Sequence, residues 1–222
     1  MAKHFIEHLR NELDLLYNGS DTIRVALIRE VTNNYIFTAD SATKTLTSEG
    51  HNFVNGSRVK VANSNGSLPT GLNSNDVYYI IGVSGNDFKL SLTRGGAPTD
   101  ITSNGAGTQT ILEQTFDETD DLSILARHEV DYYGATVRPV YNPDVARADY
   151  TNKLAYLPTE VIEFAPTQAS IDFRYVLLIR GGAATRGDVT GNADQLHDYG
   201  TTQIIQQGSI KGIEIYIQRR NG

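Results

Sequence analysis

The chain has 222 residues, about one and a half average domains, so one or two compact units are expected. Its 19 basic and 26 acidic residues give a formal net charge of −7, which argues against binding to nucleic-acid phosphates. The absence of cysteine excludes disulfides, zinc ribbons and thiol nucleophiles, while 20 glycines and 12 tyrosines favour strands and turns over helices.

The amino-terminal segment predicts an α-helix over residues 1–17. Its apolar residues recur at steps of four, four and three and form one stripe: Phe5, Leu9, Leu13 and Leu16. Gly19 ends the helix because glycine accepts a left-handed cap. The helix places His4 and His8 four residues apart, where they could share a metal, but without a third ligand we interpret them as polar-face residues. The segment lacks the apolar core of a signal peptide.

Residues 37–115 predict a separate domain. Between residues 41 and 113 lie ten glycines, and five basic residues balance five acidic ones, so the net charge resides elsewhere in the chain. Short apolar runs at 58–61, 77–81 and 88–92 are separated by Gly, Asn, Ser and Pro. Strands of this length, with turns about every ten residues, are typical of a small barrel or sandwich. We therefore expect a small β-barrel inserted into another domain.

Residues 1–36 and 116–222 predict one discontinuous domain around this insertion. The strongest strand patterns in these parts are 22–28, 161–164, 171–179 and 210–217. We expect the last of these strands, near the carboxyl terminus, to pair with the first. The fold class is therefore mostly β, with a β-sandwich or jelly-roll-like outer domain, an amino-terminal helix and the inserted barrel. Such an insertion is tolerated because closure entropy rises only slowly with loop length.

Five ordered blocks within residues 51–111 carry a resemblance. They are His51–Val59, Leu68–Leu72, Val77–Ile81, Phe88–Ser91 and Gly105–Thr108. Together they resemble a small β-barrel module of bacteriophage virion proteins, itself similar to the first catalytic-cysteine half-domain of ubiquitin-activating enzymes. The chain has no cysteine for thioester chemistry, so the resemblance implies the barrel and not that reaction. A helix followed by strand 21–27 and a paired strand such as 173–179 also resembles small β-sandwich proteins of phage heads and tails.

Two groups of oxygen-bearing residues are candidate calcium sites. Asp188, Asn192 and Asp194 alternate, with Thr190, across a glycine turn, which is typical of calcium loops and also of ordinary loops. A second group crowds together at Asp117, Glu118, Asp120 and Asp121. Lacking the spacing of an EF-hand, this group favours a solvated linker between domains over a calcium site or a contact with a basic patch of a neighbouring subunit.

Two long irregular segments predict contact surfaces. Residues 138–158 contain three prolines and three tyrosines, and residues 180–200 begin with a loop that carries two arginines. Tyrosine provides a large, rigid contact area with a polar tip, which suits an interface. The interface candidates are Tyr132, Tyr133, Tyr141, Tyr150, Tyr156, Arg180 and Arg186. The alternative is that these aromatic side chains simply cover the outer domain.

The two resemblances together predict a virion structural protein that is not an enzyme and needs no cofactor. The GxSxG and P-loop motifs are absent. A catalytic pair of carboxylates, as in glycosidases, stays an open alternative, since such a pair needs no sequence motif. We expect a capsid decoration or cement protein, a homo-oligomer that binds major-capsid subunits in the virion after synthesis in the host cytoplasm. The alternatives are a tail, neck or baseplate component and a host-surface glycan-binding module. Neither nucleic acid nor a membrane is an expected partner.

Overall fold

The computed structural model is mostly β. It describes residues 7, 8, 10, 11, 22–31, 33–116, 119–131, 137–142, 146–149, 151, 152, 154–157 and 159–220. The chain divides into two compact units: residues 1–29 with 129–222, called the outer unit, and residues 30–128, called the barrel unit. The barrel unit is wider than the expected insertion at 37–115, because the segment that follows the barrel packs against one end of it.

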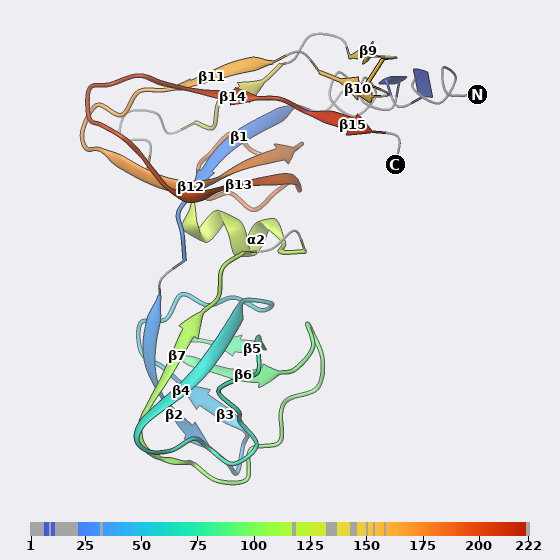
Figure 1. Ribbon diagram of the computed structural model, residues 1–222. Coiled ribbons are helices and arrows are strands. Elements are labelled where there is room, and N and C mark those ends of the chain that lie inside the picture. The colour runs from blue at the N-terminus through green and yellow to red at the C-terminus, as the bar shows by residue number, and fades with distance from the viewer. Residues whose placement is uncertain are drawn as a thin grey trace. The chain divides into compact units, whose positions relative to one another are not determined.

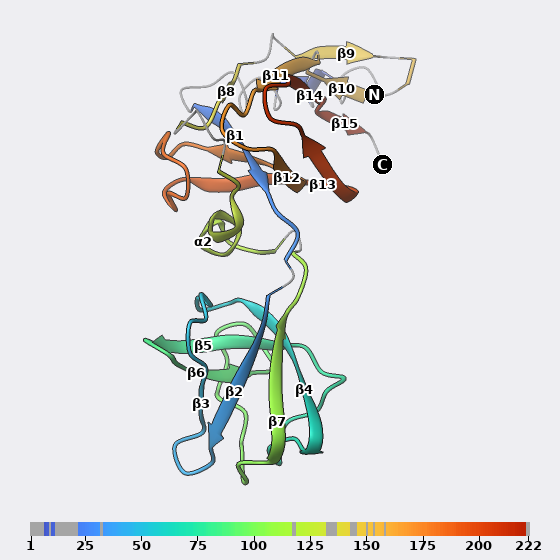
Figure 2. The same ribbon diagram turned by 90° about the vertical axis from the view of Figure 1, so that its left-hand side faces the viewer.

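The barrel unit contains a closed antiparallel barrel of six strands in the order β2-β3-β6-β5-β4-β7, which confirms the expected small barrel (Figure 1). Its strands are β2 (Asn34–Asp40), β3 (Thr45–Thr47), β4 (Arg58–Ser67), β5 (Tyr78–Ser84), β6 (Asp87–Ser91) and β7 (Ala106–Glu113). The first and last strands, β2 and β7, lie side by side (Figure 2) and pair from Asn34↔Leu112 to Phe37↔Gln109. The inserted segment therefore enters and leaves the barrel at the same end.

Inward-facing aromatic and branched side chains fill the barrel. Phe37, Phe88 and Tyr78 are almost fully buried, and the rings of Phe53 and Phe88 meet edge to face with centroids 5.6 Å apart. At Gly107 of β7, the backbones of the paired strands β4 and β7 come unusually close, beside the register shift between Ser64 and Ser67. This residue has a φ of +77°, and a Cβ there would lie 2.5 Å from the Ser64 carbonyl oxygen, so only glycine fits.

The outer unit contains three antiparallel sheets, ordered β13-β12-β1-β8, β15-β10-β9 and β11-β14 (Figures 1 and 2). Their strands are β1 (Ile23–Ile28), β8 (Val140–Tyr141), β9 (Arg147–Asp149), β10 (Leu154–Tyr156), β11 (Glu160–Phe164), β12 (Ile171–Arg180), β13 (Asn192–Ile205), β14 (Lys211–Ile215) and β15 (Gln218–Arg220). β8, β9 and β10 lie within 138–158, and most of 192–200 is strand. The expectation that 138–158 and 180–200 are irregular is therefore wrong.

One apolar cluster joins the four-stranded sheet to β11 and β14. It includes Val25 and Leu27 of β1 as well as Ile213 and Ile215 of β14. β1 pairs with β12, whereas β14 pairs with β11, so the predicted pairing of the carboxyl-terminal strand with 22–28 is wrong. The two strands share a core instead of a sheet edge, which explains why both carry matching apolar faces.

Within the described residues, the α-helix with defined bounds is α2 (Leu122–Leu125), and the 3₁₀-helix η1 (Ala126–His128) continues it. Sequence analysis did not predict either element, because seven residues are too few for a periodic stripe. The helix predicted over residues 1–17 falls mostly outside the described residues. Glu7, His8, Arg10 and Asn11 are described and helical, whereas His4 lies outside the described residues. No helix of the described part is long and apolar enough to span a membrane.

Candidate functional site

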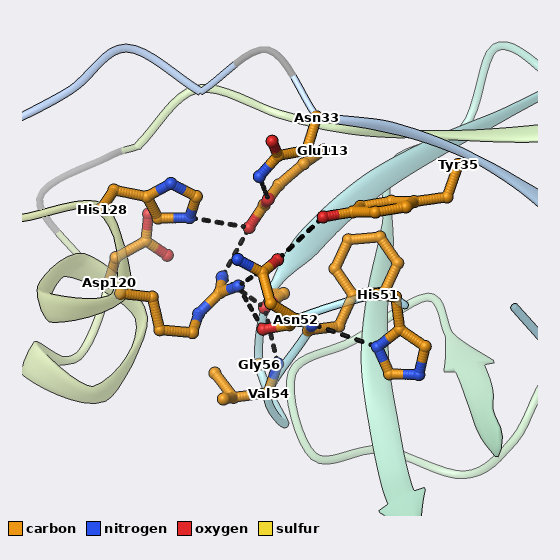
Figure 3. Close-up of polar contacts among 12 residues, drawn as sticks. Asn33, Tyr35, His51, Asn52, Val54, Gly56, Glu113, Asp120 and His128 are labelled. Carbon is orange, nitrogen blue, oxygen red and sulfur yellow. Dashed lines mark hydrogen bonds and ion pairs between the residues drawn. The ribbon is translucent and has the colours of Figure 1, made fainter. Parts of the chain in front are cut away.

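A buried polar cluster lies in the barrel unit at the end where the inserted segment enters and leaves (Figure 3). Asn33 precedes β2 and Glu113 ends β7, and the Glu113 N–H donates to the Asn33 carbonyl oxygen at 3.0 Å. The helical segment α2–η1 follows β7 and brings Arg127 and His128 to the same place. The cluster therefore joins three segments that are distant in the sequence.

Glu113 is the centre of this cluster, and its side chain is only 2% exposed. One carboxylate oxygen lies 2.5 Å from Nη2 of Arg127 and 3.4 Å from Nε2 of His128. The other oxygen accepts a hydrogen bond of 3.0 Å from the Asn33 side-chain amide. Both oxygens are thus occupied by groups of the same unit.

Arg127 extends the cluster to the loop before β4. Its Nη1 donates to the Asn52 carbonyl oxygen at 2.5 Å, and its Nη2 donates to the Ser57 hydroxyl at 3.0 Å. The Asn52 side-chain oxygen also accepts from the Tyr35 hydroxyl of β2 at 3.0 Å (Figure 3). One guanidinium therefore fastens η1 to the barrel end through both backbone and side-chain acceptors.

The electrostatics of the cluster keep Glu113 ionised. Burial works against the charge, but the contacts with His128 and Arg127 and the hydrogen bond from Asn33 outweigh it, so the pKa of Glu113 is lowered. Burial, followed by the nearby Glu113 charge, raises the pKa of Tyr35. A general acid needs a carboxyl group with a raised pKa. Glu113 therefore lacks the raised pKa of a general acid, and with both oxygens held within the unit its geometry suits a structural clamp.

A second ion pair fixes α2 to the barrel. Nη2 of Arg94 lies 2.7 Å from the Asp120 carboxylate, whose side chain is 2% exposed, and Nη1 of Arg94 donates to the Gly56 carbonyl oxygen at 3.3 Å. The interpretation of the acidic group as a solvated linker is therefore wrong at Asp120. Asp121 occupies the N-cap position of α2 without a capping hydrogen bond from its side chain, and Asp117 and Glu118 lie outside the described residues.

The outer unit has its own buried ion pair, between Glu129 and Arg138. Both side chains are fully buried, and Nη2 of Arg138 lies 2.8 Å from the Glu129 carboxylate while Nε lies 3.0 Å from it. The same carboxylate accepts from the Gly187 N–H at 2.6 Å, and Nη2 of Arg138 donates to the Asp188 carbonyl oxygen at 2.8 Å. This pair holds the loop between β12 and β13 against the unit.

The calcium candidates lie at this loop but do not come together as a site. The Asp188 carboxylate accepts from the Thr190 N–H and hydroxyl at 2.7 and 2.5 Å, which lowers its pKa and closes a turn. The Asp194 carboxylate lies 2.7 Å from Nη2 of Arg180, and Asn192 begins β13 as an exposed residue. Among the described residues, no group of three or more His, Cys, Asp or Glu residues is placed to hold a metal ion.

Four of the seven interface candidates lie among the described residues. Tyr132, Tyr133 and Tyr150 lie outside the described residues. Tyr141 is 2% exposed, so its ring belongs to the core and offers no contact surface. The three remaining candidates all have partners: Tyr156 meets the ring of Tyr216, Arg180 pairs with Asp194, and Arg186 pairs with Asp131.

Sequence reasoning missed a cavity of about 300 Å³ in the outer unit. It is lined by Val176, Leu178, Gln195, His197, Tyr199, Ile213, Glu214, Ile215, Tyr216 and Ile217. The alternation of isoleucines at 213, 215 and 217 indicates one apolar face, but the polar sequence of β13 gives no sign that it forms the opposite wall. Burial, followed by the charge of Glu214, raises the pKa of Tyr199 in this cavity.

Comparison with known proteins identifies no relative. No protein-family model, no curated protein and no solved structure matches the chain. The functional interpretation therefore rests on the geometry of the two units and on the resemblance of residues 51–111.

Proposed function

We propose that the chain is a structural protein of a bacteriophage virion, most concretely a capsid decoration or cement protein. In this role the outer unit, as a β-sandwich, binds major-capsid subunits and the inserted barrel is presented to the outside. The observation that carries the proposal is the placement of the five resembling blocks. All of them fall within the barrel unit, on the loop into β4, the turn after β4, strands β5 and β6 and the start of β7.

The outer unit also carries exposed apolar residues of the kind found at protein contacts. Val161 of β11 is 52% exposed and lies over Gly212 of β14. Tyr216, directly after β14, is 49% exposed beside Tyr156 of β10, with ring centroids 5.9 Å apart. Further exposed apolar residues of this unit are Val137, Val140, Val189, Ile204 and Ile210. These residues supply the contact surface that a cement protein requires.

The buried charges of the two units support a structural role. Glu113 and Glu129 each pair with an arginine. The Glu113 pair fixes the end of the barrel where the chain enters and leaves, and the Glu129 pair fixes a loop of the outer unit. Neither carboxylate opens onto the cavity beside β14.

Cryo-EM and mass spectrometry of intact particles test this proposal. We expect the chain in purified particles, with density on the capsid shell, and we expect a deletion phage to lose capsid stability while its tails stay intact. Density on the tail, neck or baseplate would support that alternative instead. Absence of the chain from purified particles would overturn the structural proposal altogether.

A second candidate function, binding of a host-surface glycan, is favoured by one groove of the barrel unit. The groove has a volume of about 570 Å³ and is lined by Asn34, Tyr35, Ile36, Phe37, Thr38, Thr47 and Glu49. Hydroxyl, amide and carboxylate groups beside an aromatic ring suit the hydroxyls and apolar face of a sugar. A glycan array tests it: binding that Glu49→Ala weakens and the outer-unit variant Glu163→Ala does not would support this function.

A further inference from the structure

The cavity of the outer unit has two chemically different walls. β12 and β13 contribute alternate residues, Val176 and Leu178 from one and Gln195, His197 and Tyr199 from the other, so their side-chain face forms a floor. β14 and the two residues after it contribute five consecutive residues, 213–217. Successive residues of a strand point to opposite faces, so a wall of consecutive residues is the edge of a strand.

This edge of β14 has no neighbouring strand within the described part of the chain. β14 pairs with β11 only, and β13, which borders the cavity from the other sheet, is also an edge strand. In an antiparallel pair, alternate residues direct their N–H and C=O groups away from the partner strand. An exposed edge of this kind is a template on which an extended chain can pair.

We propose that this cavity accepts an extended peptide segment of a partner protein, which adds to β14 as a strand. Such a segment places every second side chain on the floor of the cavity, where Val176, Leu178 and Ile215 make apolar side chains favourable. A small molecule needs an apolar pocket but makes no use of a strand edge, whereas this cavity presents the edge along its whole wall.

Charge defines the partner more closely. Glu214 is the exposed acidic residue of the edge, so the added strand carries Lys or Arg at the position opposite to it. A second copy of the chain is disfavoured as the donor in the β14–β14 register that places Glu214 opposite itself, because two carboxylates then face each other. The predicted segment therefore has alternating apolar side chains and one central basic residue.

The inference rests on the proposed function in one respect, that the partner belongs to the same assembly. The acceptor itself is testable on the purified full chain. The test is NMR titration of the ¹⁵N-labelled protein with a peptide library. Each peptide has about nine residues, enough to lie along residues 213–217 of the protein, with Val, Ile, Leu or Phe at alternate positions and a central Lys or Glu. We expect saturable shifts at 195–199 and 213–217 with the Lys peptides, and slowed amide exchange along 213–217.

Two matched variants locate the binding. His197→Trp fills the cavity from an exposed position and is expected to weaken binding at least tenfold, whereas Thr201→Trp, exposed on the same strand but outside the cavity lining, leaves it unchanged. Glu214→Lys is expected to weaken the Lys peptides about tenfold and to strengthen their Glu counterparts, because the cross-strand charge pair reverses. All three variants change exposed side chains, so folding is preserved.

Three outcomes would overturn the inference. The first is that no peptide of the library binds at about 1 mM, an affinity of about −4 kcal/mol. The second is that decanoate or anilinonaphthalene sulfonate shifts the same residues while the peptides do not. The third is a chain dimer that His197→Trp dissociates, which would assign the edge to a second copy. None of these outcomes removes the chain from the particle, so the proposed function stands or falls separately.

Discussion

The barrel unit and the outer unit are both built from β-strands, but their strand edges differ. In the barrel every strand has two neighbours, because the pairing of β2 with β7 closes the order of six strands. In the outer unit the four-stranded sheet ends at β13 and β8, and β14 pairs on one side only within the described residues. Since exposed edges recruit further strands, assembly contacts through the backbone are expected in the outer unit. The closed barrel has no free strand edge for such pairing.

The largest expected effect follows from removing the buried carboxylate of the outer unit. Glu129→Ala leaves the fully buried Arg138 without its partner and is expected to cost about 3–5 kcal/mol of unfolding free energy. Hydrogen exchange of the β1 and β12 amides measures this loss, while the β2 and β7 amides are expected to keep their protection. The exposed Glu163→Ala is the control and is expected to stay within about 0.5 kcal/mol. Equal loss in both units would contradict their independence.

Glu113→Ala makes the corresponding change in the barrel unit. The expected cost is about 3 kcal/mol, because Arg127 is 12% exposed and gains some hydration when its partner is lost. Here the β2 and β7 amides lose protection and those of β12 do not. Glu49→Ala, an exposed carboxylate of the same unit, is expected to change little. A loss of stability in Glu113→Ala as small as that in Glu49→Ala would show that the Glu113–Arg127 pair does not stabilise this end of the barrel.

Two glycines test how tightly the barrel is closed. Gly107→Ala is expected to cost about 2–3 kcal/mol, because φ is +77° and the new Cβ meets backbone atoms at 2.5 Å. Gly85→Ala, at a φ of +61° with no atom within 4 Å, is expected to cost about 1 kcal/mol. Urea denaturation of the two variants measures the difference. Equal costs would mean that the strands β4 and β7 can separate at Gly107.

The smallest expected effect is the pH dependence that Glu113 gives to the barrel unit. Because the pKa of Glu113 is lowered on folding, its ionised form stabilises the unit above the unfolded pKa of about 4.3, and that stability is lost as the pH falls through the folded pKa. Amide exchange of β7 as a function of pH measures this loss. In Glu113→Gln, this pH-dependent part of the barrel's stability is expected to disappear. A wild-type barrel whose protection is constant in acid would contradict the assigned cause.

The sequence allowed most strands to be predicted but not the clusters that hold them. Runs such as 77–81 and 171–179 have strand formers bounded by turn residues, and they correspond to β5 and β12. β13 was missed because its 14 residues are mostly polar, and it becomes a strand through its pairing with β12. The pairing of β14 was predicted wrongly, since alternation reveals a face and not a neighbour.

The polar cluster was beyond reach for a different reason. Asn33, Glu113 and Arg127 lie 80 and 14 residues apart, and no spacing rule connects them. Asp120 belongs to an acidic run that suggested a solvated linker. The structure shows that its carboxylate is buried and paired with Arg94. The short helix α2 depends on the same contacts, because four residues have little helical stability in isolation. Contacts between residues distant in the sequence therefore determine which of these polar side chains are buried, and local sequence patterns do not reveal such contacts.

The most direct test of the difference between the two units is hydrogen exchange of the chain alone and in the assembled particle. We expect assembly to slow exchange in the outer unit, along 192–217 and in β11, and to leave exchange in the barrel strands β2, β4 and β7 unchanged. Protection confined to the barrel, with 192–217 exchanging as in the isolated chain, would contradict it.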